Sequence, residues 1–282
     1  MENSYGKSDV RLTKVVRSGD RHELFELTVR IMLGGEFDRV YTEADNSSCI
    51  PTDTMKNTVY ALARTRSFDS PEAFARILAE HFLELEQVAW AEVDVAQDAW
   101  ARISVSGAPH PHAFTRRGSG QRTARVRASR GAAVAAWGGL RGLEVIKTTR
   151  SGFAGFFKDR LTTLPETTDR IFATAVDAVW EYAPAGRGKA PEPAYPQVFE
   201  TAREALLETF ATHDSASVQH TIYAMGEELL ARCPEVASVS LSMPNQHRLL
   251  ANLQPFGLDN PNEIFVATSE PFGLINGTIR RE

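Results

Sequence analysis

Seven polar residues fall near the expected ends of helices and strands, where side chains can converge on a small molecule. They are Lys7, Thr52, Asp53, Arg170, Gln219, Asn245 and His247. A lysine, a threonine and a histidine can pass a proton along a relay. An arginine and a glutamine can hold a planar heterocycle by paired hydrogen bonds, and the arginine fork also matches an anion. Phe153, in a glycine-flanked loop, can stack on such a ring.

The stretch from Pro51 to Tyr60 follows a strand-like run and opens a helix, and its start is unusually polar. Thr52, Asp53 and Thr54 would surround the free N–H groups of the helix, where an anion or a polar heterocycle can be held. The alternative is that Thr52 or Asp53 only caps the helix. Each of the seven polar residues, taken singly, has such a capping or surface alternative, and composition alone does not show that they converge.

The composition indicates an ordinary globular protein that does not bind nucleic acid as its main partner. The chain has 282 residues, enough for one large domain or two of ordinary size. Its net charge is −5, from 36 acidic and 31 basic residues, which argues against nucleic acid. Cys49 and Cys233 match neither a disulfide framework nor a paired metal motif. With a polar N-terminus, no membrane-length apolar run and no Ser-Lys-Leu ending, we expect a cytoplasmic protein without membrane contact.

Hydrophobic periodicity predicts the order strand, strand, helix, helix, strand, strand, twice over. In the first half we expect strands over 10–16, 24–33, 88–95 and 100–107, and helices from 52 or 53 and from Pro71 after an N-cap at Ser70. In the second half we expect strands over 143–149, 171–182, 236–243 and 264–268, and helices over about 197–212 and from 215. This is an α+β plan, an antiparallel sheet with helices gathered on one face.

Three further segments have alternative interpretations. Six arginines between Arg116 and Arg130 suggest an edge strand guarded by charge, solvated or between subunits, since no stacking aromatics accompany them for nucleic acid. His110 and His112 can face the same way on a strand and chelate a metal, but no third ligand is nearby. The Pro/Gly/Ala-rich segment 183–196 is expected to be a flexible excursion.

Seven sequence blocks, in order along the chain, resemble the urate oxidase (uricase) family. They are Tyr5-Gly6-Lys7, residues 52–60 (TDTMKNTVY), 110–114 (HPHAF), 162–170 (TTLPETTDR), 215–219 (SASVQ), 243–247 (MPNQH) and 260–265 (NPNEIF). Any one block is weak evidence, whereas their joint occurrence is specific. The resemblance implies two tandem tunnelling-fold (T-fold) units of ββααββ each, which we place at residues 1–135 and 136–282. It also implies a homotetramer whose sheets close into a tunnel-like barrel.

The resemblance further implies oxidation of urate by O₂ and water to 5-hydroxyisourate and hydrogen peroxide, with no metal and no organic cofactor. The active sites would lie at subunit interfaces. One chain would contribute Lys7, Thr52 and Asp53, and its neighbour Phe153, Arg170, Val218, Gln219, Asn245 and His247.

Each role carries over from the family by position. Arg170 and Gln219 would hold urate in its plane, Phe153 would stack on it, and the backbone of Val218 and of Asp53 would add hydrogen bonds. Lys7, Thr52 and His247 would form the proton relay, and Asn245 with Thr52 would hold O₂ or the attacking water.

Three rival interpretations remain. A non-catalytic T-fold protein that binds a purine or a pterin would keep Arg170, Gln219 and Phe153 but could lose the relay residues. A metal-dependent enzyme would use His110 and His112 instead. A purely structural oligomer would not need the polar constellation at all.

Overall fold

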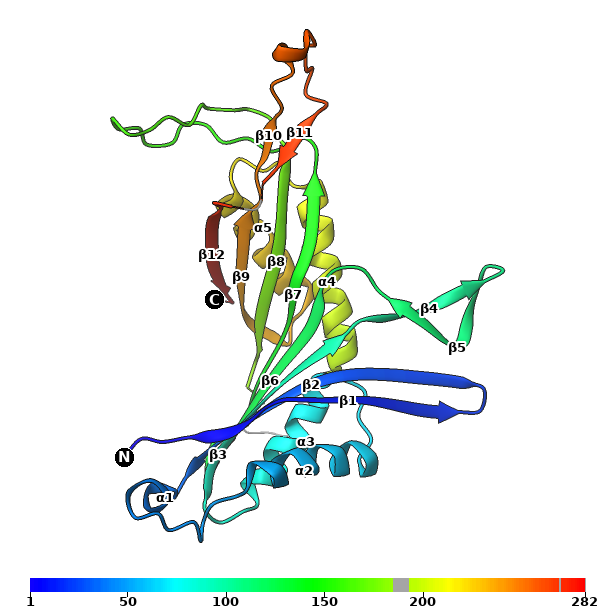
Figure 1. Ribbon diagram of the computed structural model, residues 1–282, viewed down its shortest axis with the longest axis vertical. Coiled ribbons are helices and arrows are strands. Elements are labelled where there is room, and N and C mark those ends of the chain that lie inside the picture. Colours follow the sequence, from blue (N-terminus) through cyan, green and yellow to red (C-terminus); the bar gives the residue numbers. More distant parts are fainter. Residues whose placement is uncertain (185–192, 269, 282) are drawn as a thin grey trace. The chain divides into compact units, whose positions relative to one another are not determined.

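The computed structural model describes residues 1–184, 193–268 and 270–281 (Figure 1). Contacts divide the chain into two compact units. Unit 1 contains Met1–Leu140 and Trp180–Phe199, and unit 2 contains Arg141–Val179 and Glu200–Glu282. The division expected from sequence, 1–135 and 136–282, stays a prediction. Most of the expected excursion at 183–196 lies outside the described residues.

Unit 1 is an antiparallel sheet with helices on one face, which confirms the α+β prediction. Its strands are hydrogen-bonded in the order β1 (Tyr5–Ser18), β2 (Arg21–Gly35), β3 (Val88–Asp98) and β6 (Gln121–Ser129). The helices are α1 (Asp38–Thr42), α2 (Thr52–Thr65) and α3 (Pro71–Leu83). Strands β4 (Trp100–Val105) and β5 (Ala108–Arg116) form a separate hairpin. The strand expected over 100–107 therefore forms as β4, but it lies outside the main sheet, where β6 is the neighbour of β3.

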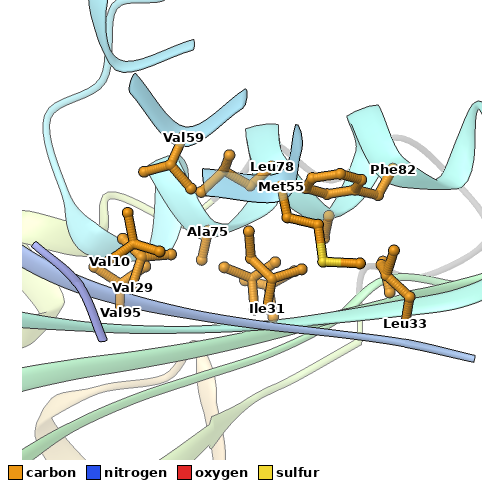
Figure 2. Packing of buried hydrophobic residues seen from close by; sticks show 14 of the residues in the cluster. Val10, Val29, Ile31, Leu33, Met55, Val59, Ala75, Leu78, Phe82 and Val95 are labelled. Carbon is orange, nitrogen blue, oxygen red and sulfur yellow. The ribbon is translucent and has the colours of Figure 1, made fainter. Parts of the chain in front are cut away.

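The core of unit 1 lies between this sheet and the helices α2 and α3 (Figure 2). Alternate residues of β2 point to the helical side, and Val29, Ile31 and Leu33 are fully buried there. Met55 of α2 and Phe82 of α3 pack onto them from above (Figure 2). The helix α3 begins as its sequence predicts, since the Ser70 side chain accepts from the backbone N–H of Ala73.

The arginines of β6 do not guard an edge, so that prediction was wrong. β6 pairs with β3 on one side and with β7 (Ala135–Lys147) on the other. Arg125 bonds Asp94 of β3 at 2.7 Å, and Arg127 lies 3.3 Å from Glu92. Arg30 of β2 reaches Asp94 from the other side at 2.8 Å. The arginines thus belong to a cross-strand ion-pair network on half-exposed positions.

A buried charged cluster fastens the segment Trp180–Phe199 to the rest of unit 1. Glu72, which is 0% exposed, pairs with Arg122 at 2.7 Å and accepts from the Tyr182 hydroxyl at 3.2 Å. Burial raises the pKa of Glu72, and Arg122 opposes this by favouring the carboxylate. Arg122 also donates to the carbonyl of Tyr195 and lies over the ring of Phe199. The cluster thus combines one ion pair with contacts to three aromatic residues.

We expect Glu72→Gln to lower the free energy of unfolding by about 3 kcal/mol, because it leaves the Arg122 charge buried without its carboxylate. Urea unfolding followed by circular dichroism measures the change. Glu80→Gln is the control on the same helix, where an exposed pair with Arg76 is lost at a cost of about 0.5 kcal/mol or less. Equal losses in the two variants would contradict a stabilising role for the buried pair.

Unit 2 contains the rest of β7, β8 (Phe172–Tyr182) as far as Val179, and α4 (Tyr195–Thr212) from Glu200 on. It also contains α5 (Val218–Arg232), β9 (Val236–Asn245) and β12 (Gly273–Arg280). The short strands β10 (Arg248–Leu250) and β11 (Phe265–Ala267) pair with each other, and a 3₁₀ turn, η1 (Gln254–Phe256), lies between them. Helix α5 packs on β9 and β12, closely enough that a Cβ at Gly226 would lie 2.5 Å from the Ile279 side chain.

The sequence prediction missed the last strand of unit 2. β12 is the antiparallel partner of β9, whereas the predicted strand at 264–268 corresponds to β11, in the separate pair. Among the described residues, no helix is both long and apolar enough to cross a membrane.

Candidate active site

A cavity of about 910 Å³ in unit 2 brings together six of the nine sequence-predicted site residues. They are Phe153, Arg170, Val218, Gln219, Asn245 and His247. The volume lies within the range of roughly 300–1,000 Å³ that is typical of small-molecule sites. The lining also contains Asp169 and Arg248, which the sequence analysis did not single out.

The loop after β7 fixes the ring of Phe153. Its backbone N–H donates to the carbonyl of Thr167 at 2.7 Å, and the N–H of Thr167 donates back at 3.0 Å. The ring stacks on Phe156, with centroids 4.8 Å apart and planes 13° from parallel. A Cβ at Gly152 would lie 3.0 Å from the carbonyl of Thr168, so glycine suits this close approach. The loop therefore presents an aromatic face in a defined orientation.

Arg170 is a half-buried cation beside that ring. Its guanidinium carbon lies 5.5 Å from the centroid of Phe153, and its backbone N–H donates to the carbonyl of Ser151 at 2.7 Å. Burial lowers the pKa of Arg170, and among the residues that the structure describes no carboxylate forms an ion pair with it. Arginine remains charged at neutral pH. The cavity thus contains an unneutralised cation, which favours an anionic ligand.

Asp169 organises the turn that carries Arg170. Its carboxylate accepts from the Thr149 hydroxyl at 2.7 Å and from the backbone N–H of Ser151 at 3.3 Å. These hydrogen bonds, the one from Thr149 first, hold the pKa of Asp169 below its usual value. Its backbone carbonyl accepts from the Thr167 hydroxyl at 2.8 Å. The acid adjacent to Arg170 in sequence is thus engaged with the loop backbone and a hydroxyl.

The start of helix α5 supplies hydrogen-bond donors to the cavity. Val218 and Gln219 are its first two residues, and the Ser217 side chain caps it by accepting from the N–H of His220 at 3.1 Å. The N–H groups of the first helical residues have no partner within their own helix. Together with the positive end of the helix dipole, they favour an anion or a carbonyl oxygen.

Asn245 and His247 come from the end of β9. Asn245 pairs with Gly273 of β12, and the N–H of Gln246 donates to the carbonyl of Ala173 at 3.0 Å. The carbonyl of His247 accepts from the N–H of Thr268 and from Nη1 of Arg248, each at 3.1 Å. The backbone on both sides of the two side chains is therefore fixed.

Lys7, Thr52 and Asp53 belong to unit 1. Lys7 lies on β1 opposite Ile31, just before a bulge that ends at Val10. Thr52 is the first residue of α2, whose N-cap position is taken by Pro51 without a side-chain hydrogen bond. The capping alternative for Thr52 and Asp53 is therefore wrong.

The carboxylate of Asp53 instead bonds Lys56 and Asn57. The hydrogen bond from Lys56 and its positive charge are the main reasons that the pKa of Asp53 is lowered. The charge of Lys7 attracts the same carboxylate more weakly.

Tyr5 ties the strand that carries Lys7 to the segment before Thr52. Its hydroxyl accepts from the backbone N–H of Ile50 at 2.7 Å, and its ring meets Phe37 edge-on at 5.0 Å. Burial raises the pKa of Tyr5. The sequence signal for this contact is the position of Tyr5 within the Tyr5-Gly6-Lys7 block.

We expect Tyr5→Phe to lower the free energy of unfolding by about 1–2 kcal/mol, because it leaves the N–H of Ile50 without an acceptor. The control is Tyr41→Phe, which removes an exposed and longer hydrogen bond to the carbonyl of Ser4 at 3.4 Å. The urea midpoints of the two variants measure the difference. Equal urea midpoints for Tyr5→Phe and the control would contradict the role of the Tyr5 hydroxyl in anchoring the segment before Thr52.

The two histidines considered for metal binding lie on β5 in unit 1. The rings of His110 and His112 are 4.5 Å apart, and His22 lies 5.8 Å from His112. Within the ranges 1–184, 193–268 and 270–281, no group of three or more His, Cys, Asp or Glu is arranged to hold a metal ion.

In this α+β chain, one cavity is lined by an aromatic face, a helix N-terminus and a guanidinium that pairs with no carboxylate among the described residues. This combination can bind a planar, negatively charged small molecule. The family model for uricase matches residues 3–127 and 137–276. The uricase of Arthrobacter globiformis is 43% identical over 282 residues, covering 100% of this chain and 89% of that protein. The uricase of Aspergillus flavus is 39% identical over 98% of this chain and 95% of its own length.

Solved structures agree in fold. The crystal structure of the Arthrobacter globiformis uricase aligns with a TM-score of 0.92 at 43% identity, over 100% of this chain and 94% of the other. A uricase from Bacillus fastidious aligns with a TM-score of 0.83 at 25% identity, over 99% and 93%. The chain belongs to the uricase family and has the T-fold that its sequence blocks imply. It is therefore a urate oxidase, an oxidoreductase that acts on urate.

Proposed function

We propose that urate is oxidised in the cavity of unit 2, by O₂ and water, to 5-hydroxyisourate and hydrogen peroxide, without a metal or an organic cofactor. Urate loses two electrons, O₂ gains them with two protons, and the oxygen of water becomes the new hydroxyl. The observation that carries the proposal is the half-buried Arg170, which lies beside the ring of Phe153 in that cavity and forms no ion pair with any described carboxylate.

Binding follows from the shape and charge of urate, a flat monoanion near neutral pH. Arg170 neutralises that charge with two parallel hydrogen bonds, and the side-chain amide of Gln219 helps to hold the ring in the same plane. Phe153 stacks on the ring, and the backbone N–H of Val218 donates to a ring carbonyl. The backbone amide of Asp53 fixes the remaining edge. These groups determine orientation and do not take part in electron transfer.

Chemistry requires a more electron-rich urate, because O₂ accepts electrons one at a time. Lys7, Thr52 and His247 remove and relay a proton so that bound urate becomes a better donor. Asn245, with the hydroxyl of Thr52, holds O₂ and then the attacking water above the ring. Since Lys7 and Thr52 belong to unit 1 while His247 lines the cavity of unit 2, the relay needs groups from both units.

We place these partners in neighbouring chains of a homotetramer, where Lys7, Thr52 and Asp53 of one subunit complete the cavity of the next. Two observations support an assembly. Strand β1 has 14 residues and pairs, among the described strands, only with β2, which leaves a long edge open. The β10–β11 region exposes several large apolar side chains, namely Leu249, Leu250, Phe256, Leu258, Ile264 and Val266. A cytoplasmic location is part of the same proposal, since Cys49 and Cys233 are both free thiols.

The test is the loss of ultraviolet absorbance of urate with metal-free protein, O₂ and excess EDTA, with hydrogen peroxide measured in parallel. Equal amounts of urate lost and peroxide formed are expected. Activity that appears only when metal is added would overturn the cofactor-free reaction. Binding of urate by calorimetry without oxidation would favour the purine-binding alternative.

A further inference from the structure

A buried pair of hydroxyls lies beneath the start of helix α5, outside the cavity lining. Oγ of Ser215 and Oγ1 of Thr221 are 2.6 Å apart, and the two residues are 3% and 0% exposed. Each hydroxyl also lies within hydrogen-bond distance of the carbonyl of Ser217, at 3.1 Å and 3.2 Å. Both hydroxyls therefore contact the carbonyl of the N-cap residue, and Thr221 itself lies in the first turn of the helix.

Ser215 is also joined to the loop that carries Phe153 and Arg170. Its backbone N–H donates to the carbonyl of Arg150 at 3.0 Å, and its carbonyl accepts from the N–H of Gly152 at 2.8 Å. Ser151, between those two residues, accepts from the N–H of Arg170 at 2.7 Å. The backbone of Ser215 thus contacts the ring-bearing loop, while its side chain contacts the helix that begins with Val218 and Gln219.

The hydroxyls are not required to cap the helix, because the side chain of Ser217 already does so. Apolar side chains of similar size would fill the same buried space without polar atoms that must be paired. A hydrogen bond differs from apolar packing in that it fixes both distance and direction. The two hydroxyls therefore set the position of the helix start relative to the loop.

We propose that Ser215 and Thr221 are positioning residues that hold the stacking ring of Phe153 and the amide of Gln219 at the separation that a bound purine requires. The inference rests on the proposed function, in which Phe153, Val218 and Gln219 contact urate. Thr221 acts from the buried side of the same helical turn and touches no substrate.

The separation matters because the ring of Phe153 and the amide of Gln219 contact different parts of one rigid ligand. If the helix start moves against the loop, stacking and the in-plane hydrogen bonds cannot both be satisfied. A misplacement of about 1 Å in a reacting geometry can reduce the rate on the order of 10²-fold. Loss of the hydroxyl pair should therefore weaken binding and turnover together.

The experiment compares Thr221→Val, Thr221→Ser and Ser215→Ala, each checked for native circular dichroism and for the oligomeric state of the unmodified enzyme. Urate affinity is measured by calorimetry without O₂, where no turnover occurs, and kcat and KM are measured in air. We expect Thr221→Val and Ser215→Ala each to raise the anaerobic Kd about tenfold and to lower kcat, while Thr221→Ser stays within about twofold. The double variant should lose little more than either single variant, since both remove the same bond.

Thr174→Val is the matched control, because Thr174 is 1% exposed in unit 2 and its hydroxyl has no partner among the described residues. It should leave Kd, KM and kcat unchanged. If Thr221→Val and Ser215→Ala lower only the melting temperature and leave Kd and kcat at the values of the control, the pair is merely structural and the inference is wrong. Additive losses in the double variant would also overturn it. An unmodified enzyme that fails to bind or oxidise urate would instead overturn the proposed function.

Discussion

Replacing Arg170 by Gln should lower kcat/KM for urate by about 10²-fold, and most of the loss should appear as a higher KM. Glutamine keeps a planar amide but removes the charge and one arm of the fork. A hydrogen bond to a charged group contributes about 1.5–3 kcal/mol, and each 1.4 kcal/mol corresponds to about a tenfold change. Because urate is already an anion before it reacts, the interaction stabilises the ground state and the transition state alike, and KM carries the effect.

Arg248 offers the matched control for this variant. It lines the same cavity, but its Nη1 already donates to the carbonyls of Gln246 and His247, at 3.4 Å and 3.1 Å. Arg248→Gln should therefore change KM far less than Arg170→Gln does. Steady-state kinetics at fixed O₂ and anaerobic calorimetry measure both. Equal increases in KM for the two variants would mean that the cations of the cavity attract urate in general, and that Arg170 makes no specific forked contact with it.

The sequence predicted elements well where local signals determine the structure. Helix α3 has a serine cap, a proline in its first turn and apolar residues at helical spacing, and it forms at Pro71–Leu83. The hairpin of β1 and β2 turns at Gly19, whose φ of +58° suits glycine. Such features depend on residues that are neighbours in the chain.

The prediction was wrong where pairing between distant segments decides the structure. β12 has one buried hydrophobic residue, Ile279, so it gives almost no hydrophobic pattern. The strand at Trp100–Val105 does alternate, yet it forms its own hairpin with β5 because Gln121–Ser129 pairs with β3. Six arginines looked like edge protection, but Glu92 and Asp94 across the strands neutralise Arg125 and Arg127.

The predicted site residues lie in the family blocks, except for Phe153, which its glycine-flanked loop singled out. Spacing along the chain did not predict that these residues converge. Phe153, Arg170, Gln219 and His247 come from four segments far apart in sequence, and only the fold brings them to one cavity. The supporting residues, such as Asp169, Ser215 and Thr221, are common residue types, and nothing in their residue type sets them apart. Their importance depends on burial and hydrogen-bond partners, which no sequence pattern reveals. The assignment of each role to each residue stays a prediction.

Breaking the relay should have the largest effect on turnover. Lys7→Met and Thr52→Val should each lower kcat about 10²–10⁴-fold, the usual range for positioned proton transfer. The anaerobic Kd for urate should change little, because neither side chain provides the anion contact. The two losses should not add in the double variant, since residues that act as a unit lose their function together.

Two controls separate proton transfer from charge and from helix structure. Thr54→Val removes a hydroxyl from the same turn of α2 at an exposed position and should leave kcat unchanged. Lys7→Arg keeps the positive charge, but a guanidinium cannot give up its proton in a protein, so this variant should be as slow as Lys7→Met. Recovery of turnover in Lys7→Arg would show that Lys7 acts only as a fixed charge. In that case proton removal would have to be assigned to His247 and Thr52 alone.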